Sequence, residues 1–129
     1  MKTIASLFLL VLVSSFVYKT TCDTDQLYGK WLLVDSYDEG TVTVDSLLRT
    51  KIVSHTRVKL TYQKNGMAQN DQGDYLTWEM FTISKATCLI QHIGLTSNAL
   101  RNIYMLYLDE HYLITSERGK IYFYEREEQ

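Results

Sequence analysis

The sequence predicts an all-β protein, either a β-sandwich or an antiparallel β-barrel. Ten tyrosines, four phenylalanines and two tryptophans among 129 residues favour strands. From Arg57 to Gln63, apolar residues occupy the even positions and polar residues the odd ones, which is the period of a strand with one buried face. Similar segments recur between polar breaks, roughly seven or eight in all, as in small sandwiches and barrels. The length allows a single domain.

The N-terminal residues 1–22 read as a secretory signal peptide. Lys2 supplies a positive charge, and an almost wholly apolar run from Ile4 to Val17 follows it. At about 14 residues, this run is shorter than the ~20 residues that a helix needs to cross a bilayer. Cleavage after Ser15 and cleavage after Cys22 both fit the small residues there, so the site lies within 15–22. The remaining domain is therefore 23–129.

The chain contains two cysteines, Cys22 and Cys88. If the signal peptide is cut before Cys22, the two can form a disulfide in an oxidising compartment and close a loop of about 66 residues. If the cut falls after Cys22, Cys88 remains as a single buried thiol. We expect the disulfide.

The first half of the domain contains three predicted strands and one helical turn. A strand is expected at 28–37 and ends at the polar residues 38–40, after which 41–44 returns as a short second strand. A helical turn is expected at 45–51, with Asp45 or Ser46 as its N-cap. The strand at 57–63 is followed by Asn65-Gly66, a pair that tolerates the positive φ of a type I′ hairpin turn.

The second half predicts five further strands. The break at 70–73 precedes a strand at 75–84, and another strand follows at 87–93. Residues 95–102 are expected to form a loop or a short helix. Strands at 103–108 and 112–116 are separated only by Asp109-Glu110-His111, and a last strand at 120–127 follows Arg118-Gly119.

Three stretches resemble the motifs of the lipocalins, members of the calycin superfamily that also includes the fatty-acid-binding proteins. Gly29 and Trp31 stand as in the Gly-x-Trp motif, residues 108–112 resemble the turn motif with Leu108 in place of threonine, and Arg126 follows the apolar end of the last strand. The resemblance implies one antiparallel up-and-down β-barrel of about eight strands with one short helix. It also implies that Trp31 plugs one end of the barrel and that Arg126 lies over the indole ring.

No catalytic motif is present, and the three histidines His55, His92 and His111 lack the spacing of metal ligands. We therefore expect no enzyme activity, no cofactor and no metal site. The formal charge of −2 shows no basic excess, so neither nucleic acid nor an anionic membrane surface is expected as a partner. Stable membrane insertion is not expected either, because the apolar run is too short to span a bilayer.

These observations lead to the hypothesis of a secreted carrier that holds a small hydrophobic ligand inside the barrel. The alternative is a secreted protein-interaction module, such as an inhibitor or receptor ligand, with a filled core and an exposed patch around Tyr122 and Tyr124. The candidate ligand-binding residues are the large apolar ones on the predicted strands: Tyr62, Trp78, Met80, Tyr104, Leu106 and Tyr122.

Overall fold

A computed structural model describes residues 22–70, 72–84, 87–96 and 99–128 of the chain. The predicted signal peptide at 1–22 therefore lies, except for Cys22, outside the described residues. Eight antiparallel strands pair in sequence order, and β8 pairs with β1, so the sheet closes into a barrel. The prediction of a single antiparallel barrel of about eight strands is confirmed. The strands are β1 (Gly29–Asp38), β2 (Lys59–Tyr62), β3 (Met67–Gln69), β4 (Tyr75–Ser84), β5 (Thr87–Gly94), β6 (Leu100–Leu108), β7 (Tyr112–Glu117) and β8 (Lys120–Arg126).

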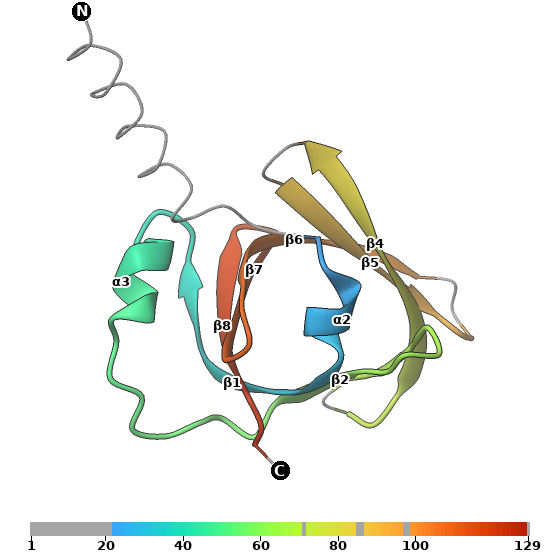
Figure 1. Cartoon of the computed structure of the whole chain (residues 1–129), viewed down its shortest axis with the longest axis horizontal. Coiled ribbons are helices and arrows are strands. Elements are labelled where there is room, and N and C mark those ends of the chain that lie inside the picture. The colour runs from blue at the N-terminus through green and yellow to red at the C-terminus, as the bar shows by residue number, and fades with distance from the viewer. Residues whose placement is uncertain (1–21, 71, 85–86, 97–98, 129) are drawn as a thin grey trace, which may run out of the picture.

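Two short helices accompany the barrel, where the sequence predicted one. Helix α2 (Thr24–Leu27) lies within the ring of strands when the barrel is viewed along its axis, and α3 (Val44–Leu48) lies outside it (Figure 1). The missed helix α2 is only four residues long, too short to show an apolar period. Its burial depends on the barrel around it, because Leu27 is fully buried there.

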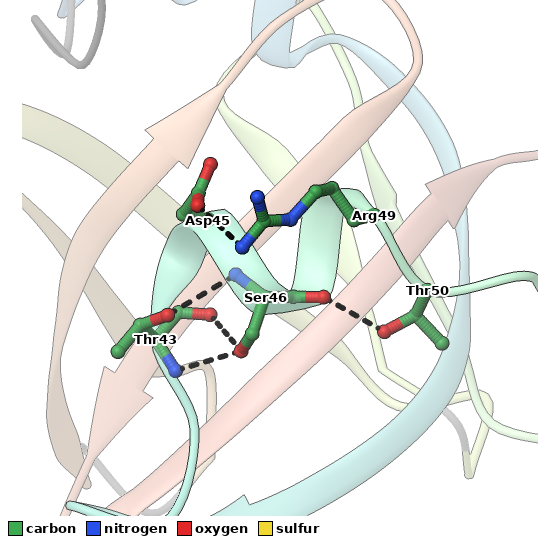
Figure 2. A network of polar contacts seen from close by, with 5 residues as sticks. All are labelled: Thr43, Asp45, Ser46, Arg49 and Thr50. Atoms are coloured by element: carbon green, nitrogen blue, oxygen red, sulfur yellow. Dashed lines mark hydrogen bonds and ion pairs between the residues drawn. The ribbon is translucent and has the colours of Figure 1, made fainter.

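Helix α3 begins earlier than expected because Thr43, and not Asp45 or Ser46, is its N-cap. The Ser46 N–H donates to the Thr43 hydroxyl at 3.1 Å, and the Thr43 N–H donates to the Ser46 hydroxyl at 3.0 Å, forming a capping box (Figure 2). An ion pair between Arg49 and Asp45 at 2.8 Å spans the helical turn (Figure 2). Since the helix takes in Val44, the predicted strand at 41–44 is wrong.

Two hydrophobic clusters account for most of the buried residues. One fills part of the barrel interior and includes Leu27, Trp31, Tyr62 and Trp78. The other lies on the outer wall, where Leu47 of α3 and its neighbours cover the outward-facing side chains of β7 and β8: Ile114, Ile121 and Phe123. The strands therefore carry apolar residues on both faces wherever α3 covers the sheet.

The hairpin turn at Asn65-Gly66 differs from the prediction in its geometry. Gly66 has φ +83°, but Asn65 is not among the described residues with positive φ, so Asn65-Gly66 does not form a type I′ turn. The Gly66 N–H donates to the carbonyl of Gln63. The loop from Gln63 to Gly66 thus ends in a glycine with a left-handed backbone conformation. The two-residue turn with positive φ at both positions is Arg118-Gly119, at +52° and +80°, between β7 and β8.

The start of β6 and the presence of β3 also differ from the prediction. Residues 100–102 belong to β6 and pair with β5, so the loop or helix expected at 95–102 is replaced in part by strand. The short strand β3 follows the turn after Gly66 and was not among the predicted strands. Three residues are too few for a periodic signal, and β3 exists because β2 and β4 pair with it on either side.

One end of the barrel is closed by Trp31 and Arg126. The Trp31 side chain is fully buried and its indole N–H donates to the Leu27 carbonyl at 2.9 Å. The Arg126 guanidinium lies 4.2 Å from the centre of the indole ring and donates to the carbonyls of Tyr28 and Gln26. The contact between Trp31 and Arg126 that the lipocalin resemblance implies is therefore present.

The predicted disulfide between Cys22 and Cys88 is confirmed, with the two Cα atoms 5.6 Å apart. It joins the segment before α2 to the inner face of β5, where Cys88 is fully buried. In the chain-entropy description, a bridge between residues 66 positions apart stabilises the folded state by about 4 kcal/mol.

Candidate ligand cavity

The barrel interior is only partly filled, and a cavity of about 250 Å³ remains beyond the core around Trp31 and Trp78. Its wall combines apolar and polar side chains from strands on opposite sides of the barrel. The apolar side chains are Leu33, Val58, Leu60 and Ile103, and the polar or aromatic ones are Lys59, Asn70, His92, Arg101, Thr115, Glu117, Tyr122 and Tyr124.

An ion pair between Arg101 and Glu117 borders the cavity. The Arg101 guanidinium donates through Nε to Oε2 at 2.9 Å and through Nη2 to Oε1 at 2.5 Å, so the contact is bidentate. These hydrogen bonds hold the pKa of Glu117 below its usual range although burial opposes that shift. The Glu117 side chain is 8% exposed and that of Arg101 is 48% exposed. The Glu117 carboxylate thus lies inside the barrel, bonded to the side chain of Arg101 at the barrel rim.

His92 and Tyr62 form a second polar contact beside the cavity. The Tyr62 hydroxyl lies 2.7 Å from Nε2 of His92 in a buried hydrogen bond. The other ring nitrogen, Nδ1, is buried and has no hydrogen-bond partner among the described residues. Leaving such a group unpaired costs about 1–3 kcal/mol relative to its hydrated state.

Burial decides the charge state of these two side chains. It lowers the pKa of His92 to about 4, and the positive charge of Arg101 acts in the same direction. Burial also raises the pKa of Tyr62 well above its ordinary value. Both groups are therefore neutral at pH 7, and the Arg101–Glu117 pair carries the charges of this cluster.

A second hollow, of about 440 Å³, adjoins the cavity at the rim of the barrel. It shares Asn70, His92 and Arg101 with the cavity and extends to Tyr75 and Leu95. Arg101 borders both spaces and is half exposed, so it lies at the boundary between them. The cavity thus has an entrance at the rim opposite to the end that Trp31 closes.

The structure places the six predicted ligand-binding residues in three different environments. Tyr122 lines the cavity, whereas Tyr62, Trp78 and Met80 belong to the interior cluster next to it. The rings of Tyr62 and Trp78 pack edge-to-face with centres 4.9 Å apart, which fills that part of the barrel.

Tyr104 and Leu106 lie outside the barrel, so their predicted place in the interior is wrong. The β5–β6 register pairs Cys88 with Met105 on the inner face and leaves Tyr104 opposite Leu89 on the outer face, where it is 46% exposed. Leu106 lies at an irregularity in the β6–β7 register and packs against the outer cluster under α3.

The predicted interaction patch around Tyr122 and Tyr124 is also misplaced, because both side chains line the cavity. Sequence reasoning missed the polar residues of the wall, above all His92, Arg101 and Glu117. Alternation offered a signal for one of them, because His92 shares its side of β5 with Cys88 and Ile90.

Neither protein-family models, nor curated proteins, nor solved structures yield a match to the chain. Within the described ranges, no group of three or more histidine, cysteine or acidic side chains is arranged to hold a metal ion. No helix in the described part of the chain has the length and apolar character needed to cross a membrane.

Proposed function

We propose that this chain is a secreted, lipocalin-like carrier that binds one small, mainly hydrophobic molecule in the cavity. The observation that supports it is the space of about 250 Å³ inside a closed barrel whose core is otherwise well packed. A filled core, which the alternative of a pure interaction module requires, would leave no such space.

The volume sets the size of the ligand. An engineered protein cavity of roughly 150 Å³ holds benzene, so a cavity of about 250 Å³ suits a compound with one or two rings. A long lipid chain would extend from this space into the hollow at the rim. The apolar wall of Leu33, Leu60 and Ile103 favours the ring system.

The polar part of the wall favours a ligand with one hydrogen-bonding group. Thr115, Tyr122 and Tyr124 bring hydroxyls to the cavity, and His92 adds a buried ring nitrogen without a partner. A ligand hydroxyl that reaches Nδ1 of His92 supplies the hydrogen bond that this buried nitrogen lacks among the described residues.

Secretion is supported by the N-terminal sequence together with the disulfide. Disulfides persist in oxidising compartments, and the residues before Cys22 have the pattern of a signal peptide. Because Cys22 is bonded to Cys88, the proposal places the cleavage site before Cys22.

The test is calorimetric titration of the oxidised protein with 2-naphthol, naphthalene and palmitate. We expect 2-naphthol to bind more tightly than naphthalene, because only the naphthol has a hydroxyl for the polar wall. We expect palmitate to bind more weakly than 2-naphthol, because its chain does not fit within the cavity. The variant Ile103→Trp fills the cavity from β6 and is expected to abolish naphthol binding while the protein stays folded.

Leu100→Trp is the matched control, because it adds the same ring on the same strand at an exposed position. It is expected to bind 2-naphthol as the wild type does. If the wild type binds neither aromatic compound, or if Ile103→Trp binds 2-naphthol unchanged, the cavity is not a ligand site.

A further inference from the structure

Strand β4 extends well beyond the strand that pairs with it on one side. The three residues of β3 pair with Tyr75–Thr77 only, whereas β5 pairs with β4 as far as Ser84. Figure 1 shows the β4–β5 hairpin projecting past the ring formed by the other strands. From Glu79 to Ser84, β4 is therefore the edge of a sheet.

Among the described residues, no partner is found for part of the backbone hydrogen-bonding groups along this edge. The Trp78 N–H donates to the carbonyl of Gly66 at 3.0 Å, so the backbone N–H and C=O groups of Trp78 point towards the β3 side of the strand. Alternate residues of an antiparallel strand direct their N–H and C=O groups to the same neighbour. Met80 and Thr82 therefore present theirs along the free edge, beyond the end of β3.

Beyond Glu79, the side chains along this edge lack the features that usually prevent pairing. Edge strands of natural proteins are usually protected by lysine, proline or other charged residues. Between Met80 and Ser84 there is no charged residue and no proline, and Phe81 and Ile83 are 41% and 52% exposed. The segment is rich in residues that favour strands.

An apolar row on the outer face of the sheet ends at this edge. Phe81 lies opposite Leu89 on β5, and Leu89 lies opposite Tyr104 on β6. The neighbouring row is polar, with Gln91 donating to Asn102 at 3.0 Å. The apolar row is therefore a stripe one residue wide, which ends at the β4 edge. Helix α3 covers the outer wall of β7 and β8 but none of this stripe.

We propose that a second copy of this chain pairs antiparallel along the β4 edge, with the two-fold axis passing through Phe81. In this register Met80 lies opposite Thr82 of the partner subunit. Each such pair exchanges two backbone hydrogen bonds, and symmetry supplies two pairs. Phe81 then lies opposite the same residue of the partner, which joins the two apolar rows into one.

The segment matches a copy of itself in three respects. Its free N–H and C=O groups occur in equal number and are related by the two-fold axis, and aromatic residues opposite each other stabilise antiparallel pairs by about 0.2–1 kcal/mol. The charged residue of the segment, Glu79, lies two positions from the axis, so the two carboxylates do not face each other. An isologous contact of this kind uses the same edge on both copies and closes as a dimer.

The first test is cross-linking of Phe81→Cys under mild oxidation. Opposite residues at a non-hydrogen-bonded position have Cα atoms about 4.5 Å apart, which is within the range of a disulfide. We expect a covalent dimer joined at position 81, identified by peptide mass spectrometry. Tyr104→Cys, comparably exposed on the outer face but two strands away from the axis, is expected to form no covalent dimer.

The second test is sedimentation equilibrium of Thr82→Pro and Thr82→Val. The N–H of Thr82 points to the free edge, so proline removes a dimer hydrogen bond without removing one from the β4–β5 ladder. We expect Thr82→Pro to raise the dimer Kd at least tenfold and Thr82→Val, which keeps the N–H, to leave it unchanged. Unchanged thermal unfolding of the monomer verifies that Thr82→Pro folds.

Three results would overturn the proposal. They are a wild-type protein that sediments as a monomer at about 100 μM, a dimer that persists in Thr82→Pro, and equal cross-linking of Phe81→Cys and Tyr104→Cys. An edge that instead captures extended peptides of unrelated sequence would give the first of these results. None of the readouts depends on ligand binding, so they are independent of the carrier function.

Discussion

We predict that acidification destabilises this protein through His92 at pH values above those at which carboxylates titrate. The imidazole is buried beside the cavity, and burial together with the charge of Arg101 lowers its pKa to about 4. In the unfolded chain a histidine titrates near 6.5. Between these values the unfolded state binds a proton that the folded state does not, so stability falls as the pH falls.

The magnitude follows from the two pKa values. They differ by about 2.5, and each unit is worth about 1.4 kcal/mol, so the full effect is about 3 kcal/mol. The contribution is fully present above about pH 6.5 and is lost as the pH falls towards 4. Of this loss, about 2 kcal/mol occurs between pH 7.5 and pH 5. Glu117 acts with the same sign but at lower pH, because its carboxyl pKa is lowered by Arg101.

The assay is urea unfolding of the oxidised protein at pH 7.5 and pH 5, followed by tryptophan fluorescence. His92→Gln removes the titrating ring and keeps a side chain able to hydrogen-bond to Tyr62. We expect the variant to lose about 2 kcal/mol less than the wild type between the two pH values. His111→Gln, at the exposed hairpin tip between β6 and β7, is the matched control and should keep the wild-type pH dependence.

The comparison uses the change between two pH values within each variant, so a uniform loss of stability in His92→Gln does not affect it. The reasoning is refuted if the wild type and His92→Gln lose the same free energy between pH 7.5 and pH 5. An NMR titration in which His92 takes up its proton near pH 6.5 in the folded protein would refute it as directly.

Three further predictions concern the frame of the barrel. Replacing Cys22 and Cys88 by serine together is expected to lower the free energy of unfolding by about 4 kcal/mol in urea titrations, and unchanged stability would contradict this. Gly29→Ala places a Cβ 2.6 Å from Nη1 of Arg126 at a φ of +126°, so we expect a loss of about 2 kcal/mol. The control Gly40→Ala, at a φ of +90° with no atom within 4 Å of the new Cβ, carries the backbone strain alone and is expected to lose less; an equal loss would contradict the role of the Arg126 contact. Arg118→Asn keeps the turn but suits its positive φ better, so thermal unfolding should shift upward by a few degrees, corresponding to up to about 1 kcal/mol.

The positions of most strands were predictable because local patterns specify them. Strand β4 was predicted with its exact bounds, and Arg118-Gly119 was correctly placed between two strands. The pairing of Cys22 with Cys88 was also accessible, since the chain contains no other cysteine.

The side of the sheet that each residue occupies was not predictable on β6. Residues 103–106 are all apolar or aromatic, so alternation allows either set to face inward. The register with β5 turns Met105 to the inside and Tyr104 to the outside. This ambiguity exists because the outer wall is also apolar where α3 covers it.

The sequence by itself determined an all-β domain, the place of its main strands and the disulfide, because these depend on local periodicity and on residue type. Only the tertiary structure decided that a cavity remains and that it is bordered by polar side chains. Arg101 and Glu117 are 16 positions apart, and Tyr62 and His92 are 30 apart. Such contacts depend on barrel closure and strand register, which emerge from the packing of the whole chain rather than from any single segment.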